Sequence, residues 1–207
     1  MGEPAKPARV DGRKQRSERT RQAIIEAFLG LLREHSPQIP TAVQIAERAG
    51  YSVRSVFERF PDLLTLRVAA TDYAFAMGNA QAVPHDVDGD RATRLRSQVE
   101  TRARTCEQWL PLWRALNTNQ GDSVELKMRI RLAREMIVKR LELMYAPELS
   151  SLSEVDRKRT LLALEALTDF ESWARMRDLY GLSFEGACEL WIGVIDRLLP
   201  PTPVQPH

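Results

Sequence analysis

Residues 41–60 read TAVQIAERAGYSVRSVFERF, and this stretch decides the fold. Thr41, followed three residues later by Gln44, forms a capping-box pattern that starts a helix. Gly50 supplies a residue that tolerates a positive φ, which a tight turn between two helices requires. Ser52 can then cap the next helix. The stretch therefore predicts two short helices joined by a tight turn.

The apolar residues of this stretch predict how the two helices pack. A close crossing needs a small residue at the contact, and Ala46 supplies one. Ile45, Val56 and Phe60 can fill the core beneath the crossing. The second helix is then left with its first residues projecting outward, as a helix that enters the DNA major groove must be. We predict a helix-turn-helix unit over residues 17–65, and an arbitrary helical hairpin is the alternative.

The rest of the chain has the pattern of an all-α protein. Apolar residues recur at three- and four-residue steps, and alternating strand patterns are absent. We predict a three-helix N-terminal domain followed by a larger helical domain over residues 66–199. Helices of the larger domain are expected at about 91–108, 109–118, 123–145, 153–180 and 183–199.

The charge of the chain is unevenly distributed. Residues 1–21 hold seven basic and three acidic residues, a net charge of +4, whereas the whole chain carries +2. We predict a disordered basic arm over residues 1–16, which would suit a polyanion because each neutralised phosphate releases counterions. A solvated tail is the alternative. The Pro-rich residues 200–207 are predicted to be a disordered tail.

Several classes of protein are disfavoured by the sequence. The sequence contains no run of 18 apolar residues, so it predicts no membrane span. Its polar, Pro-rich N-terminus does not resemble a secretory signal. Cys106 and Cys188 lack metal-type spacing and are interpreted as reduced thiols of a cytoplasmic protein. HExxH, GxSxG and Gly-rich phosphate-loop motifs are absent. We therefore predict no enzyme, no cofactor, no metal and no membrane partner.

The helix-turn-helix stretch and its flanks resemble the tetracycline-repressor (TetR) family of transcriptional regulators. The residues that carry this resemblance are Arg21, Ile25, Ala27, Phe28, Thr41, Ile45, Ala46, Gly50, Ser52, Phe60 and Leu66. The resemblance implies a cytoplasmic, nucleoid-associated homodimer that binds double-stranded DNA at a near-palindromic operator. It also implies a repressor released by a small-molecule effector. A helical protein-interaction module and a regulator without a ligand are the alternatives.

Three positions depart from the pattern of that family. Phe57 stands where members usually carry a tyrosine whose hydroxyl meets a phosphate. Arg59 replaces the usual histidine and could restore a phosphate contact. Leu63 stands where a lysine commonly opens the fourth helix. We expect the basic arm to compensate by entering an adjacent minor groove.

The DNA contacts are expected mainly on the second helix of the motif. Arg54 is the principal candidate base reader because arginine can bridge both acceptors of a guanine, and Val53 could pack on a thymine methyl. Thr41 and Ser52 are expected to contact phosphates, although each could serve as a cap alone. Arg54 could instead be a solvated charge. The full predicted set is Arg19, Arg21, Thr41, Ser52, Val53, Arg54, Ser55, Phe57 and Arg59.

The larger domain is expected to bind a ligand and to form the dimer. The resemblance, together with aromatic and methionine side chains, predicts a ligand pocket lined by Trp109, Trp113, Met136, Phe170 and Trp173. The last two helices are apolar on more than one side, which predicts a two-fold four-helix bundle between protomers. Its predicted residues are Leu167, Phe170, Trp191 and Ile195. For the pocket residues the alternative is that they simply fill the core, and for the dimer residues it is burial within one protomer.

Overall fold

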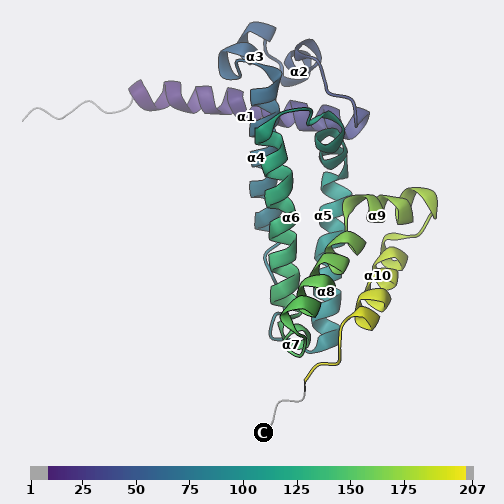
Figure 1. Ribbon diagram of the computed structural model, residues 1–207. Helices are drawn as coiled ribbons and strands as arrows, with labels where there is room; N and C mark the ends of the chain where they lie inside the picture. The colour runs from purple at the N-terminus through teal and green to yellow at the C-terminus, as the bar shows by residue number, and fades with distance from the viewer. Residues whose placement is uncertain (1–8, 204–207) are drawn as a thin grey trace, which may run out of the picture. The chain divides into compact units, whose positions relative to one another are not determined.

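The structure is a computed structural model that describes residues 9–203. It separates into two compact units, Met1–Tyr73 and Ala74–His207. No strand occurs among residues 9–203, so the predicted all-α class is confirmed (Figure 1).

The first unit is built from three helices and the beginning of a fourth. They are α1 (Arg9–His35), α2 (Ala42–Ala49), α3 (Val53–Arg59) and α4 (Leu63–Gln81). Side chains from all four helices bury a common core that contains Ile24, Phe28, Leu32, Ile45, Val56, Phe60 and Leu66. This core includes the three residues predicted to lie beneath the helix crossing.

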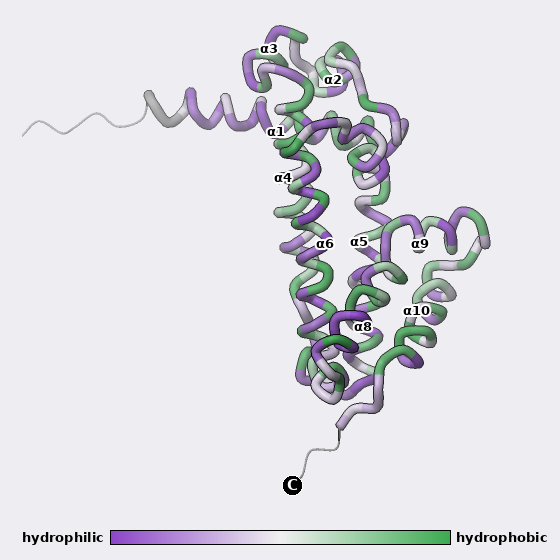
Figure 2. The backbone as a smooth tube through the Cα atoms, viewed as in Figure 1, coloured by the Kyte–Doolittle hydropathy of each residue, from purple (hydrophilic) through white to green (hydrophobic). Residues whose placement is uncertain are grey.

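Two boundaries of the first unit differ from the prediction. Residues 9–16 are not disordered but form the first turns of α1, because arginine, lysine and glutamine favour a helix and the Arg16 side chain donates to the Gly12 carbonyl at 3.1 Å. Figure 2 shows the turns of α1 that follow its grey start as mostly hydrophilic. Residues 1–8 of the predicted arm lie outside the described residues. The unit also extends beyond residue 65 to Tyr73, whose hydroxyl donates to the Glu26 carboxylate at 3.5 Å.

The second unit is a bundle around two long helices. α5 (Arg91–Asn119) and α6 (Val124–Met144) run side by side, and Figure 2 shows hydrophobic and hydrophilic residues interleaved along both. The chain continues through α7 (Ala146–Leu149), α8 (Glu154–Leu167), α9 (Phe170–Ala174), the π-helical turn η1 (Arg175–Leu179) and α10 (Phe184–Leu198). α9 and α10 both pack against α5.

Two predicted helices of this unit were wrong in extent. α5 continues through Pro111 instead of dividing at residues 108–109. The helix predicted over residues 153–180 breaks after Leu167, because the Asp169 side chain accepts the Ser172 N–H at 2.9 Å and starts a new helix.

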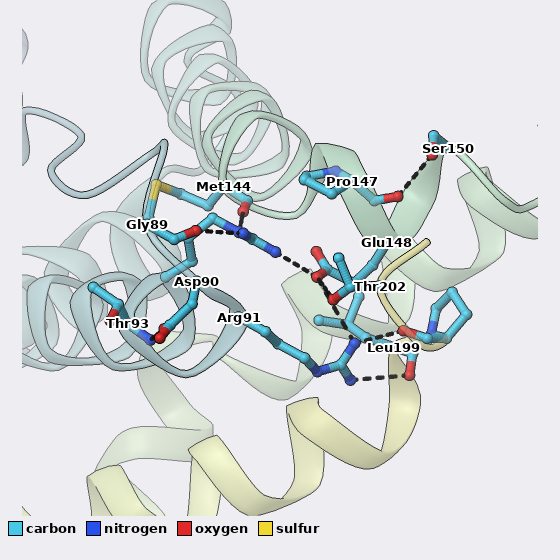
Figure 3. Close-up of polar contacts among 12 residues, drawn as sticks. Gly89, Asp90, Arg91, Thr93, Met144, Pro147, Glu148, Ser150, Leu199 and Thr202 are labelled. Carbon is cyan, nitrogen blue, oxygen red and sulfur yellow. Dashed lines mark hydrogen bonds and ion pairs between the residues drawn. The ribbon is translucent and has the colours of Figure 1, made fainter. Parts of the chain in front are cut away.

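A buried carboxylate, that of Glu148 in α7, links the two ends of the second unit (Figure 3). The Arg94 guanidinium and the Thr202 hydroxyl both donate to its Oε1, and Arg91 Nη1 lies 3.8 Å from the same oxygen. Arg94 also donates to the carbonyl of Met144 at 3.0 Å. These contacts join the first turn of α5 to α7 and to the segment that follows α10.

The segment after α10 is therefore not a disordered tail over its first residues. Arg91 donates to the carbonyl oxygens of Leu199, at 3.2 Å, and Pro200, at 2.5 Å. It also donates from Nε to the Asp196 carboxylate at 2.7 Å. Residues 200–203 are placed by these bonds and by Thr202, whereas residues 204–207 lie outside the described residues.

Candidate nucleic-acid interface and ligand cavity

The turn between α2 and α3 is fixed by local hydrogen bonds. The Thr41 hydroxyl accepts the Gln44 N–H at 3.3 Å, and the Gln44 side chain accepts the Thr41 N–H at 2.9 Å, which completes the predicted capping box. Gly50 ends α2 with φ at +74° and donates its N–H to the carbonyls of Ala46 and Glu47. A side chain at this φ would be strained, so the turn requires glycine here.

The following helix presents its first turn to solvent. The Ser52 hydroxyl accepts the Ser55 N–H at 3.1 Å and caps α3. Val56 is buried, so the opposite side of the helix faces outward. The Arg54 side chain lies there and is 89% exposed, with its Nε donating to the Glu58 carboxylate at 3.0 Å. Exposed pairs of this kind are weak, so the guanidinium is free to exchange Glu58 for a base edge.

The other predicted contacts on α3 differ in exposure. Phe57 is 44% exposed, but its ring has no hydrogen-bond donor. Arg59 is half-buried, and its Nη1 lies 3.9 Å from the Glu58 carboxylate. The Arg59 Nε atom is buried without a hydrogen-bond partner among residues 9–203. Only the Nη groups of Arg59 could therefore meet a phosphate, whereas Phe57 offers only apolar contact.

The predicted arginines of α1 are placed differently from those of α3. Arg19 is exposed. The Arg21 guanidinium lies 5.2 Å from the centre of the Phe60 ring and 3.9 Å from the Glu18 carboxylate. Arg21 therefore already contacts Phe60 of the helix-turn-helix core, whereas the exposed side chain of Arg19 is more available to a ligand.

Two exposed residues of this unit were missed by the sequence analysis. Tyr51, in the turn between α2 and α3, is 39% exposed, and Val43 on α2 is 53% exposed. Both are residue types that usually suggest core. For Tyr51 the available signal was its position between Gly50 and Ser52, because turn residues seldom reach the core.

The second unit contains a cavity of about 440 Å³. Four of the five predicted pocket residues line it, namely Trp109, Trp113, Met136 and Phe170. The Trp113 and Phe170 rings stack with their centroids 4.8 Å apart and form one wall. Most of the remaining wall comes from the end of α4, the following loop, and the facing sides of α5 and α6. The size is within the range of roughly 300–1,000 Å³ that is typical of small-molecule sites.

Trp173 does not line the cavity, contrary to the prediction. Its ring lies 5.0 Å from that of Trp191 and 5.5 Å from that of Phe184, and its indole N–H donates to the Glu107 carboxylate at 3.2 Å. It lies one turn beyond Phe170, where α9 passes into η1, and the aromatic rings that contact it belong to α10.

The predicted dimer residues are also mostly internal. Trp191 and Ile195 are 0% exposed within a single chain, Phe170 is buried and Leu167 is half-buried. The strongly apolar side of α10 packs within its own unit, largely against α5, so it is not an interface between protomers. The large apolar side chains that α8 and α10 leave exposed are Val155, Leu162, Leu190 and Leu198.

The remaining groups to consider are the two cysteines and any set of side chains that could bind a metal. Cys106 and Cys188 are free and buried, and burial raises the pKa of each thiol to about 11. Within residues 9–203, no cluster of three or more His, Cys, Asp or Glu side chains is arranged to hold a metal ion. No helix of that range has the length and apolar character that a membrane crossing needs.

Comparison with known proteins identifies the fold. A transcriptional regulator from Rhodococcus sp. Rha1 superposes with a TM-score of 0.71 at 16% identity, covering 88% of this chain and 99% of its own. A TetR-family transcriptional regulator from Streptomyces coelicolor gives 0.68 at 18% identity, covering 87% and 79% respectively. No protein-family model matches the sequence, and no curated protein matches it. The chain therefore has the fold of TetR-family regulators, and the resemblance is confirmed at the level of fold.

Proposed function

We propose that the chain is a DNA-binding transcriptional regulator, a repressor that a small-molecule effector releases from its operator. The observation that carries this proposal is the exposed first turn of α3, which projects Arg54 from a rigidly capped helix-turn-helix. The regulators with the same fold support it. We further propose that it acts in the cytoplasm, on nucleoid DNA.

Base reading is assigned to Arg54, supported by Val53 and Ser55. Arginine donates two hydrogen bonds to guanine O6 and N7, and such a pair is worth about 1–3 kcal/mol of discrimination. Thr41, Ser52 and Arg59 are assigned to phosphates, which position the unit on the duplex. Tyr51 is added to this group because it is 39% exposed and directly precedes Ser52 in the turn.

The test is selection of binding sites from random duplexes, followed by titration of the selected site. Arg54→Ala should weaken binding by about 1–3 kcal/mol and relax the preference at one base position. Arg131→Ala is the matched control, because Arg131 is 83% exposed on α6 of the other unit. An equal loss on all sequences would instead make Arg54 a phosphate contact.

The proposal includes a homodimer, because one helix-turn-helix reads too few base pairs to be selective in a genome. Two copies would present their recognition helices to successive major grooves, about 34 Å apart, on a near-palindromic operator. The second copy is assigned to the face of α8 and α10 that carries Leu162 and Leu190, which are 54% and 45% exposed.

Sedimentation tests this interface. Leu162→Glu combined with Leu190→Glu should convert a dimer into a folded monomer with weak operator binding. Leu132→Glu, at a position 50% exposed on α6, is the control and should remain dimeric. A parent protein that sediments as a monomer and still binds its operator tightly would contradict the assignment.

A further inference from the structure

The polar side chains of the cavity are unbalanced in charge. Its walls are largely hydrocarbon, and the charged residues among them are Arg102, Lys139 and Arg140. No aspartate, glutamate or histidine is among the residues that line it. Cations held against apolar walls are costly unless an anion accompanies them.

Arg140 is the most exceptional of these cations. Its Nε donates to Gln98 Oε1 at 2.6 Å, and its Nη1 donates to the Ala82 carbonyl at the end of α4. Its Nη2 atom is buried and has no hydrogen-bond partner among residues 9–203. No carboxylate in that range forms an ion pair with it, and burial lowers the pKa of the guanidinium. The side chain is therefore fixed at two of its nitrogens, and the third nitrogen, Nη2, is left without an acceptor.

Two further groups of the wall are suited to an anion. The Arg102 guanidinium is buried, donates to the Thr168 carbonyl at 2.8 Å and lies 4.6 Å from the centre of the Phe170 ring. The indole nitrogen of Trp109 is buried and has no partner within the described residues. It faces Gly78, where an added Cβ would lie 3.5 Å from the nitrogen.

We infer that this cavity binds an apolar carboxylate, with the carboxylate at Arg140 Nη2 and the hydrocarbon or aromatic body along the Trp113–Phe170 wall. An acceptor with negative charge satisfies the Nη2 group and compensates the buried Arg102 and the half-buried Arg140. A neutral ligand does neither, and an amine would meet like charge. This inference rests on the proposed function, because it takes the cavity to be the effector site and adds the chemical class of the effector.

The experiment is isothermal titration of the full chain without DNA at pH 7.5, using two matched pairs of compounds. Decanoate is compared with decan-1-ol, and 2-naphthoate with 2-naphthamide, so that the shape of the body does not decide the outcome. At least one carboxylate should bind ten- to a hundred-fold more tightly than its neutral partner, as expected for a buried charge-assisted hydrogen bond.

Three variants test whether the preference for carboxylates comes from the cavity residues. Arg140→Gln should remove it and leave the neutral compounds unchanged, whereas Arg140→Lys should keep most of it. Trp109→Phe, which removes only the N–H, should weaken the carboxylates about three- to tenfold. Arg131→Gln is the matched control on the same helix, outside the cavity, and should bind as the parent does.

The outcomes are decisive in both directions. Equal affinity within both pairs, or no binding by either carboxylate, overturns the inference, as does a preference that survives Arg140→Gln. If Arg140→Gln does not fold, Arg140→Lys and Trp109→Phe decide. Operator release is measured separately. A carboxylate that binds without releasing DNA contradicts the effector role alone, whereas release by the neutral compounds only contradicts the charge assignment alone.

Discussion

The helix caps of the first unit and the buried ion pairs of the second unit are polar contacts of very different range. In the helix-turn-helix unit the capping pairs, such as Thr41 with Gln44, join residues three positions apart and lie at the surface. In the second unit arginines reach across the bundle. Arg94 meets Glu148 54 residues away, and Arg91 meets Asp196 105 residues away.

This difference determines what each unit loses with one side chain. A surface cap stabilises one helix end, and when the capping side chain is removed, water can accept the hydrogen bond in its place. A buried ion pair leaves an uncompensated charge when one partner is removed. We expect the helix-turn-helix to tolerate substitution better than the bundle, which would suit the proposed role of its surface in reading a particular DNA sequence.

The largest expected effect is therefore in the bundle. Glu148→Ala would leave Arg94 and Arg91 without their buried anion, and the free energy of unfolding should fall by about 3–5 kcal/mol in urea denaturation. Glu142→Ala is the control, because Glu142 pairs with Arg157 at 2.5 Å with both side chains 43% exposed, and it should cost no more than about 1 kcal/mol. Equal losses would remove the contrast between the units.

A smaller effect is expected at the turn of the first unit. Gly50→Ala should lower stability by about 1–2 kcal/mol, because the positive φ strains any side chain although nothing lies within 4 Å of an added Cβ. Gly12→Ala is matched to it, since the space is equally open but the residue is helical, and it should be neutral or slightly stabilising. Thermal unfolding of both variants measures the difference. Similar losses would show that strain is not the cause.

The cap at the start of α2 should contribute less still. Thr41→Ala removes the acceptor of the Gln44 N–H and should cost about 1 kcal/mol. Thr41→Ser keeps a hydroxyl at the same place and should retain most of the stability. If the serine variant loses as much as the alanine variant, the methyl group rather than the cap is responsible.

The smallest effect concerns the two thiols, which report on the second unit alone. With a pKa of about 11, Cys106 and Cys188 stay protonated at pH 8 and should react with a disulfide reagent only after the bundle opens. Glu148→Ala should speed this reaction, whereas Thr41→Ala should not. Above pH 9 the unfolded chain loses these protons first, so stability should decline as pH rises towards 11. Rapid labelling of the folded parent would contradict the burial.

The range of the contacts also explains what the sequence could predict. Thr41, Gly50 and Ser52 act on neighbours in the chain, so their roles were evident from spacing and the helix-turn-helix was confirmed. Periodicity showed that Trp173 and Trp191 are apolar and buried, but it contains no information on which surface buries them. Their mutual contact replaced both the predicted pocket wall and the predicted interface.

The residues that give the cavity its charge had no local signal. Arg140 is one of four arginines of α6, of which Arg131 and Arg134 are exposed, and only the fold places it against Gln98 and Ala82. The Asp169 cap did have a signal, but the continuous apolar pattern on both sides of it obscured the break. The helical residues 9–16 were missed because charge was read as disorder, although helix propensity favoured order.

The Glu148 cluster has a consequence for the order of events during synthesis. A ribosome adds about 5–20 residues per second, so Thr202 is added roughly 3–11 s after Glu148, which lies 54 residues earlier. All the residues that form the core of the first unit have been added by then. We expect the helix-turn-helix unit to fold before the bundle, which still lacks the residues that complete its buried carboxylate site. Nascent chains halted at residue 190 should therefore show a protease-resistant first unit and a protease-sensitive bundle.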